Sequence, residues 1–175
     1  MKIIAITLAA FVAAAFSAAP ASAEIVERGE DGFVLAFEAT TPAGADAILA
    51  AIGRPAGWWS DAHTYSGSAA NITVDLRPGG CWCEALPGGG VKHGEAVLVW
   101  PERGLVRFAA PFGPLQDLGA DAVLTMSWAE AEGAEGRRLR WSFRVRGRGA
   151  GAMTDPVHTV MEEQFRRLAA HLAGG

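Results

Sequence analysis

Two cysteines, Cys81 and Cys83, are the side chains in this sequence best placed for metal or redox chemistry. Two residues apart on a strand, they would share one face, with Cα atoms roughly 6.5 to 7 Å apart, at the upper limit for a disulfide. A turn over residues 87–90 would bring either His93 or Gly94 opposite Cys83, depending on the register. Two thiolates and an imidazole suit zinc or cuprous copper, but a structural zinc site needs a fourth ligand. We therefore favour two small buried thiols, with a redox disulfide and a metal site on Cys81, Cys83 and His93 as alternatives.

His93 and Glu95 lie two residues apart on the same expected strand and would also share a face. Inside a cavity, an imidazole with a carboxylate beside it could transfer protons. No nucleophile or oxyanion donor accompanies the pair, which favours two half-solvated side chains near a hairpin turn. The sequence therefore names no catalytic residue, with His93 and Glu95 as the alternative, and it leans away from an enzyme.

The elements that position these residues begin with a strand and a short helix. Residues 32–40 alternate between apolar and polar side chains, as a strand does when one face is buried. Thr41 followed by a proline is typical of a helix N-terminus, and Gly53 is a plausible end for that helix. A further short helical turn or a loop is expected over residues 54–60.

Between residues 71 and 145 the chain reads as strands joined by turns. Residues 124–128 and 139–145 alternate most clearly, so each strand has one apolar face, as in an antiparallel sheet covered on one side. Asp155 and the proline after it are typical of a helix N-terminus, and apolar residues recur at helical spacing over 157–172. This order predicts an α+β fold in which the sheet packs on a C-terminal helix.

The N-terminus has the three parts of a secretory signal peptide. Lys2 supplies the positive charge, residues 3–16 are almost entirely apolar, and the Ala-Ser-Ala at 21–23 provides a small-residue cleavage site. The apolar stretch is shorter than the roughly 20 residues of a membrane span. We predict a signal peptide over residues 1–23, a single domain over 24–175, and export to the periplasm or out of the cell.

The charge of the chain bears on its partners. A net charge of −4 gives no reason to expect nucleic acid, whose binding domains are basic. Four arginines alternate along the polar face of one expected strand: Arg138, Arg140, Arg144 and Arg146. They could contact anionic lipid head groups, although we favour a solvated outer face. The glycine-rich stretch at 147–151 lacks the sequence order of a phosphate loop, and no cofactor is predicted.

Several motifs, taken in their order, make the chain similar to the START-like or SRPBCC superfamily, whose members have the helix-grip fold. The motifs are Trp58-Trp59, residues 76–84 (LRPGGCWCE), His93, residues 111–116 (PFGPLQ) and residues 157–172. Among the branches of the superfamily, the chain most resembles the homologues of a heat-shock-protein ATPase activator. The resemblance covers about residues 33–173.

This resemblance implies a curved antiparallel sheet of about six to seven strands wrapped round a long C-terminal helix, with one or two short helices after the first strand and an apolar cavity inside. Members bind lipids or hydrophobic metabolites, and some are enzymes such as polyketide cyclases. Export would separate this chain from a cytosolic ATPase, so that role is not carried over.

The expected function is therefore to hold a small apolar or amphipathic ligand, a lipid or hydrophobic metabolite. The alternatives are a cyclase-type or hydrolase-type cavity enzyme using His93 and Glu95, and a metal or redox module on Cys81 and Cys83. The expected ligand-binding residues are Trp58, Trp59, Cys81, Cys83, His93, Phe108, Leu124, Met126, Trp128, Trp141, Phe143, Met161 and Phe165.

Overall fold

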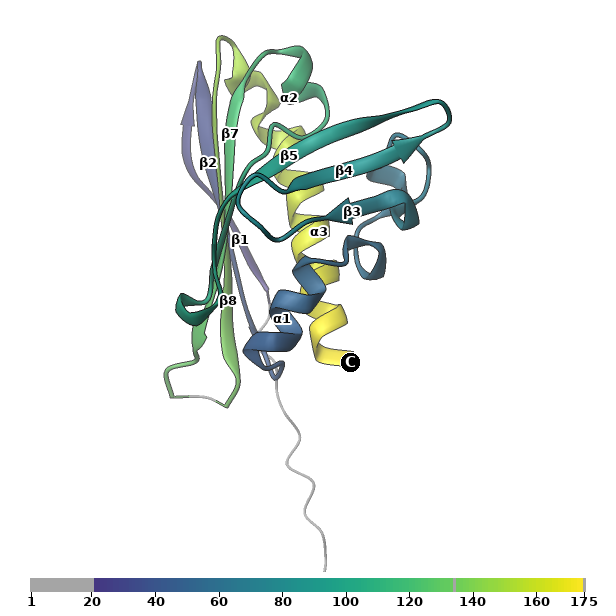
Figure 1. The fold of residues 1–175 in the computed structure, drawn as a ribbon. Coiled ribbons are helices and arrows are strands. Elements are labelled where there is room, and N and C mark those ends of the chain that lie inside the picture. Colours follow the sequence, from purple (N-terminus) through teal and green to yellow (C-terminus); the bar gives the residue numbers. More distant parts are fainter. Residues whose placement is uncertain (1–20, 134, 175) are drawn as a thin grey trace, which may run out of the picture.

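A computed structural model describes residues 21–133 and 135–174. Within them, eight strands form one antiparallel sheet in the order β1-β2-β8-β7-β6-β5-β4-β3 (Figure 1). The strands are β1 (Ser22–Gly29), β2 (Gly32–Thr41), β3 (Ile72–Val74), β4 (Cys81–Leu86), β5 (Gly89–Trp100), β6 (Leu105–Ala109), β7 (Asp121–Glu130) and β8 (Arg137–Arg146).

In the same two described ranges, three α-helices and five short 3₁₀ turns connect and cover the sheet. The helices are α1 (Ala45–Ile52), α2 (Pro114–Asp117) and α3 (Thr154–Gly174). The 3₁₀ turns are η1 (Pro55–Gly57), η2 (Asp61–His63), η3 (Ala69–Asn71), η4 (Pro101–Arg103) and η5 (Ala150–Met153). In the described residues, no helix has the length and apolar character that crossing a membrane requires.

The sheet bends, and α3 lies in the angle of the bend (Figure 1). β2, β7 and β8 form one limb, while β3, β4 and the start of β5 turn away as a second limb. Two irregularities in β5 accompany this change of direction: the register with β4 skips His93, and the register with β6 skips Val97. An extra residue of this kind kinks a strand and increases its twist, so the two β-bulges help to open the space that α3 occupies.

The core lies between α3 and the inner face of the first limb. Leu124, Met126 and Trp128 of β7 pair across the ladder with Phe143, Trp141 and Leu139 of β8, as the alternation predicts. These side chains are almost completely buried, as are the apolar residues that α3 turns toward them: Met161, Phe165, Leu168 and Leu172. The α+β helix-grip arrangement expected from the sequence is therefore present, with eight strands rather than six or seven.

The additional strand is β1, which the sequence analysis did not predict. It pairs with β2 at the edge of the sheet, and most of its residues are exposed. Its apolar side is short, because Ala23 and Ile25 pack against the core while the rest of the strand does not alternate clearly. Residues 1–20 of the predicted signal peptide lie outside the described residues. Its last two residues, Ser22 and Ala23, pair with Glu38 and Phe37 in β2.

Both predicted helix starts differ from the structure by a few residues. Thr41 belongs to β2, where it pairs with Arg137, so α1 begins only at Ala45. The hydroxyl of Thr41 still accepts a hydrogen bond from the backbone N–H of Ala43, at 3.2 Å. Helix α3 already begins at Thr154, which places Asp155 in the first helical turn instead of at the cap, and there it forms an ion pair with Arg28.

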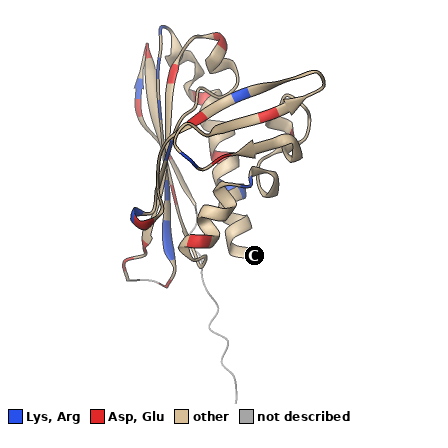
Figure 2. Cartoon of the chain, in the orientation of Figure 1, with Lys and Arg blue, Asp and Glu red and all other residues tan. Residues whose placement is uncertain are grey.

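The four arginines of the predicted basic stripe lie on the outer face of β8, as expected. Arg140 pairs with Glu38 at 2.8 Å, while Arg144 and Arg146 both reach Glu27, at 3.4 and 2.6 Å. Figure 2 shows basic and acidic residues interspersed along the strands. These ion pairs leave less uncompensated positive charge on this face than the sequence alone suggests.

Candidate ligand-binding cavity

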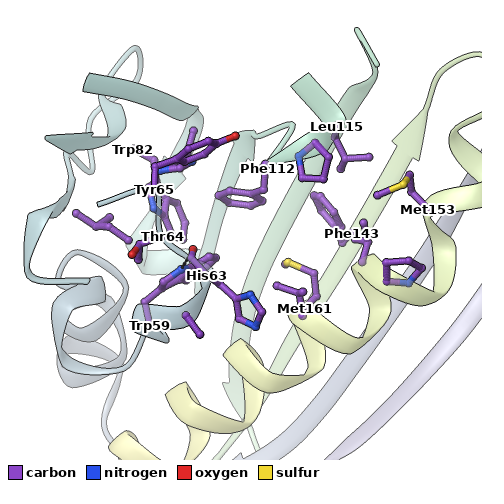
Figure 3. A pocket seen from close by; sticks show the side chains of 18 residues that line it. Trp59, His63, Thr64, Tyr65, Trp82, Phe112, Leu115, Phe143, Met153 and Met161 are labelled. Atoms are coloured by element: carbon purple, nitrogen blue, oxygen red, sulfur yellow. Dashed lines mark hydrogen bonds between the residues drawn. The ribbon is translucent and has the colours of Figure 1, made fainter. Parts of the chain in front are cut away.

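A cavity of about 360 Å³ lies between the second limb of the sheet and the N-terminal half of α3. This volume is within the range of roughly 300–1,000 Å³ typical of small-molecule sites. Side chains converge on it from both sides, with Phe112 and Phe143 between them (Figure 3). The lining residues are Trp59, Ala62, His63, Thr64, Tyr65, Ile72, Trp82, His93, Phe112, Gly113, Pro114, Leu115, Phe143, Met153, Pro156, Val157, Val160 and Met161.

Each wall of the cavity comes from a different part of the chain. One face of α3 contributes Val157, Val160 and Met161, which follow one another at helical spacing. The segment from Trp59 to Tyr65 forms the opposite wall, and β4 and β5 supply Trp82 and His93. The lining is mostly apolar and aromatic, so only a few polar groups can orient a ligand.

The first polar group is His93, which is held by Glu84 on the neighbouring strand. Nε2 of His93 lies 2.8 Å from Oε2 of Glu84, and the side chains are 8% and 0% exposed. Glu84 also accepts hydrogen bonds from the backbone N–H groups of Tyr65 and Ser66, which follow η2. Burial alone would raise the pKa of Glu84, but the hydrogen bonds from Ser66, His93 and Tyr65 together hold that pKa below its ordinary value.

An ionised Glu84 determines which nitrogen of His93 carries a proton. A carboxylate can only accept hydrogen bonds, so Nε2 must be the donor in this pair. In the neutral imidazole the other nitrogen, Nδ1, is then an acceptor. Because the ring lines the cavity, Nδ1 is the nitrogen of His93 that a ligand could engage.

A second histidine, His63, faces the cavity from η2. Its Nε2 lies 3.1 Å from Oε2 of Glu163 on α3, and its side chain is 31% exposed. A hydrogen bond from Ser60, together with the one from His63, lowers the pKa of Glu163 although partial burial opposes this. The cavity thus carries two imidazoles, each oriented by a carboxylate, and the one on β5 is the more deeply buried.

The structure separates the predicted ligand-binding residues into two groups. Four of them line the cavity: Trp59, His93, Phe143 and Met161. Seven others are almost completely buried in the core without lining it: Trp58, Phe108, Leu124, Met126, Trp128, Trp141 and Phe165. Apolar faces on the clear strands were therefore a good guide to the core and a poor guide to the cavity, which lies toward the opposite limb of the sheet.

Most residues that line the cavity were not singled out from the sequence. Phe112 and Leu115 are in a segment that carried the family resemblance, but nothing in their spacing placed them in a cavity. His63 is in none of the motifs that the sequence analysis singled out. A search for histidines whose neighbours in three dimensions are carboxylates would have found it, but the sequence does not contain that information.

The predicted pair of His93 and Glu95 is not formed. His93 is the residue that the register between β4 and β5 skips, since Trp82 pairs with Gly94 and Cys83 with Lys92. The bulge turns His93 inward, while Glu95 stays on the outer face and pairs with Lys92. The expectation that these two side chains share a face is therefore wrong, and the carboxylate beside His93 is Glu84.

The two cysteines form a disulfide, Cys81–Cys83, with a Cα–Cα distance of 5.4 Å. This distance is shorter than in an ideal strand because β4 is irregular here, where its register with β5 shifts. Both residues are half-buried and alternate with Trp82 and Glu84, which point inward. The favoured prediction of two free buried thiols is therefore wrong, as is their placement in the cavity wall.

The alternative metal site is not assembled either. The sulfurs of Cys81 and Cys83 are bonded to each other and are not thiolates, and Cys83 faces Lys92 instead of His93 or Gly94. In the part of the chain that the structure describes, no three His, Cys, Asp or Glu side chains come together as metal ligands.

The disulfide gives a direct prediction. Protein that is purified without reductant, denatured and treated with iodoacetamide should show no increase in mass by mass spectrometry. After reduction, the same treatment should add the mass of two carbamidomethyl groups, one on each cysteine. Because the bond closes a very short loop, replacing both cysteines with serine should lower the free energy of unfolding by only about 1–2 kcal/mol, measured in urea. Alkylation of the unreduced protein would show that the bond is absent.

Comparisons with known proteins support the fold. No family model matches the chain. A similar solved structure is a protein from Rhodobacter sphaeroides, with 18% identity and a TM-score of 0.59 over 88% of this chain and 100% of that one. CalU16 from Micromonospora echinospora has 17% identity and a TM-score of 0.55, over 89% of this chain and 84% of its own. Major latex-like protein 151 from Panax ginseng has 20% identity and a TM-score of 0.53, over 82% of this chain and 99% of its own. At these identities the likeness concerns the fold, and with the curved sheet and α3 it defines the chain as an α+β helix-grip protein.

One curated protein is similar in sequence, a UDP-N-acetylmuramate–L-alanine ligase from Kineococcus radiotolerans. It is 32% identical over 162 residues, which make up 90% of this chain and 33% of the ligase. The chain thus spans about a third of the length of this relative.

Proposed function

We propose that this protein binds a small apolar or amphipathic molecule in the cavity between α3 and the second limb of the sheet. The observation that carries the proposal is the lining: about 360 Å³ bounded mainly by aromatic and aliphatic side chains, with few polar groups. Such a cavity removes apolar surface of a ligand from water, which is the main favourable contribution to binding. Two of the similar helix-grip structures, CalU16 and the ginseng protein, have the same fold at low identity.

The family and the location are part of the same proposal. We assign the chain to the START-like superfamily, in the branch of homologues of the ATPase activator, as an exported member. Support comes from the motifs that carried the resemblance, because at least one residue of each lines the cavity, for example Trp59, Trp82, His93, Phe112 and Val157. The predicted signal peptide supports export, and the ligand would then be a molecule of the cell envelope or the surroundings.

Filling the cavity should weaken ligand binding strongly. Val160 lines the cavity from α3 and is half-buried, so Val160→Trp can place its indole in the space without displacing the core. We expect this variant to bind the neutral apolar dye N-phenyl-1-naphthylamine at least tenfold more weakly than the wild type, measured by fluorescence titration. Val123→Trp on the outer face of β7 is the matched control and should bind normally, because Val123 is 37% exposed. Absence of dye binding by the wild type, or equal binding by both variants, would contradict the proposed function.

One observation favours a second candidate function, a cavity enzyme. His93 is oriented by an ionised Glu84, so its Nδ1 could take a proton from a carbon acid bound in the cavity. We would then expect faster exchange of the α-protons of 2-tetralone for deuterium in D₂O with the wild type than with His93→Gln, followed by NMR. Equal exchange rates would exclude this function and leave the binding proposal unaffected.

A further inference from the structure

The Cys81–Cys83 disulfide lies on the outer face of β4, on the opposite side of the strand from the cavity. Both cysteines are half-buried, whereas Trp82 between them is completely buried and points inward. On the neighbouring strand β5, Lys92 is the partner of Cys83 and Glu95 is the partner of Cys81. The side chains of Lys92 and Glu95 are 57% and 39% exposed, so the disulfide belongs to a face of the second limb that solvent reaches.

The fold depends little on this bond. Only one residue separates the two cysteines, and a disulfide that closes so short a loop constrains the unfolded chain weakly. Exposed disulfides are also the ones that thiols reduce most readily, in contrast to buried structural bonds. We therefore expect reduction to leave the protein folded.

A small thiol can open the bond by thiol–disulfide exchange. Its thiolate attacks Sγ of Cys81, the S–S bond breaks, and Cys83 leaves with the electron pair as a thiolate. Lys92, which also pairs with Glu95, lies opposite Cys83 and stabilises that negative charge. A second thiolate then displaces Cys81 from the mixed disulfide. Two thiols are thereby oxidised to one disulfide, and their two protons end on the reduced cysteines.

The bond fixes the part of β4 that carries one wall of the cavity. The Cα atoms of Cys81 and Cys83 are 5.4 Å apart, whereas roughly 6.5 to 7 Å separates residues two apart in a regular strand. Trp82 lies between them and lines the cavity, with its ring centroid 5.1 Å from that of Phe112 (Figure 3). Once the bond is open, β4 can extend toward regular spacing, and Trp82 moves with it.

The same stretch of β4 is tied to the polar part of the cavity through Glu84. This residue directly follows Cys83, accepts hydrogen bonds from the backbone N–H groups of Tyr65 and Ser66, and lies 2.8 Å from Nε2 of His93. The register between β4 and β5 shifts immediately before Cys83. A change in β4 at this point therefore moves the carboxylate of Glu84 relative to His93.

We propose that Cys81–Cys83 is a thiol–disulfide exchange site through which small thiols control ligand binding in the cavity. This inference rests on the proposed function. In the oxidised protein the bond holds Trp82 and Glu84 in place before a ligand enters. In the reduced protein these side chains must be ordered on binding, and that loss of conformational freedom weakens the affinity.

The test compares the affinity for N-phenyl-1-naphthylamine before and after treatment with millimolar reduced glutathione, with the extent of reduction read from the mass added by iodoacetamide. We expect the reduced wild type to bind the dye about three- to tenfold more weakly. Reoxidation with glutathione disulfide should restore the affinity. Equal affinity of the two forms would overturn the inference, as would a bond that glutathione does not reduce in the folded protein.

A variant without the bond is the first control. Cys81→Ser combined with Cys83→Ser should bind the dye as weakly as the reduced wild type, and glutathione should not change its affinity. If glutathione weakens dye binding by this variant as much as by the wild type, the effect does not come from the disulfide and the inference is overturned.

Lys92→Gln tests the chemistry separately from the binding. Lys92 does not line the cavity, so the oxidised variant should bind the dye normally. The uncharged thiol 2-mercaptoethanol should reduce it severalfold more slowly than the wild type, because the leaving thiolate of Cys83 loses its positive neighbour. Equal rates of reduction would overturn the role of Lys92 in the exchange.

Hydrogen exchange followed by mass spectrometry locates the structural change. Reduction should speed the exchange of backbone amides in residues 63–66 and 81–94, and it should leave residues 139–145 of β8 unchanged. Faster exchange throughout the chain would show general loosening and contradict a local effect on the cavity wall.

The outcomes also distinguish this inference from the proposed function. Dye binding that is equally strong in the oxidised and reduced protein would overturn redox control and leave the cavity as a binding site. Absence of dye binding by the oxidised wild type would overturn the proposed function itself.

Discussion

Replacing Glu84 with alanine should lower the free energy of unfolding by about 2–4 kcal/mol at neutral pH. Glu84 is 1% exposed and joins three otherwise separate parts of the site: the Tyr65–Ser66 backbone, His93 on β5 and its own strand β4. Its removal leaves two backbone N–H groups and a buried imidazole without their acceptor. Urea unfolding followed by tryptophan fluorescence measures the loss.

The pH dependence of this difference has a definite sign. Hydrogen bonds hold the pKa of Glu84 in the folded protein below its ordinary value of 4.5, although burial opposes them. A group with a depressed pKa stabilises the folded state fully above its unfolded pKa, and the contribution is lost as the pH falls through the folded value. The difference between the wild type and Glu84→Ala should therefore be constant near neutrality and shrink below about pH 4.5.

Glu95→Ala is the matched control for this prediction. Glu95 pairs with Lys92 on the outer face of β5, where its side chain is 39% exposed. An exposed ion pair contributes little, so this variant should lose less than about 0.5 kcal/mol. A Glu84→Ala variant as stable as Glu95→Ala would show that the hydrogen bonds to Glu84 do not hold the site together.

The parts of the fold that could be predicted are those whose residues have one apolar and one polar face. β7, β8 and α3 each bury one face against the other elements, so alternation or helical spacing appears directly in the sequence. β1 could not be found in this way because it is an exposed edge strand. The start of α1 was misplaced because pairing of Thr41 with Arg137 extends β2, and no local signal encodes a partner so far along the chain.

The site was harder to predict because it depends on a change of register. In a regular strand, His93 and Glu95 would share a face. The bulge at His93 reverses that relation and brings the imidazole to Glu84. The same irregular stretch contains the disulfide. Ideal strand geometry therefore gives both too long a distance between the two cysteines and the wrong carboxylate beside His93, for one physical reason.

Trp58 was among the residues expected to line the cavity, and the packing of its ring shows why it does not. Its ring is 2% exposed, packs edge-on against Trp59, Trp82 and Trp141, and donates from Nε1 to the carbonyl of Ala51 at 2.8 Å. A side chain so enclosed fills space that a ligand would need. Trp58 therefore supports the cavity wall from behind, through its contacts with the two tryptophans that line it.

Trp58→Ala should accordingly have the largest effect on stability of any single tryptophan replacement considered, a loss of about 3–5 kcal/mol in urea unfolding. Trp100→Ala makes the same chemical change at a side chain that is 47% exposed and stacks with Arg103, so it should cost less than about 1 kcal/mol. We also expect Trp58→Ala to weaken dye binding, because Trp59 and Trp82 lose the surface that fixes their orientation. A variant that lost stability but bound the dye with unchanged affinity would show that the cavity wall keeps its shape without Trp58.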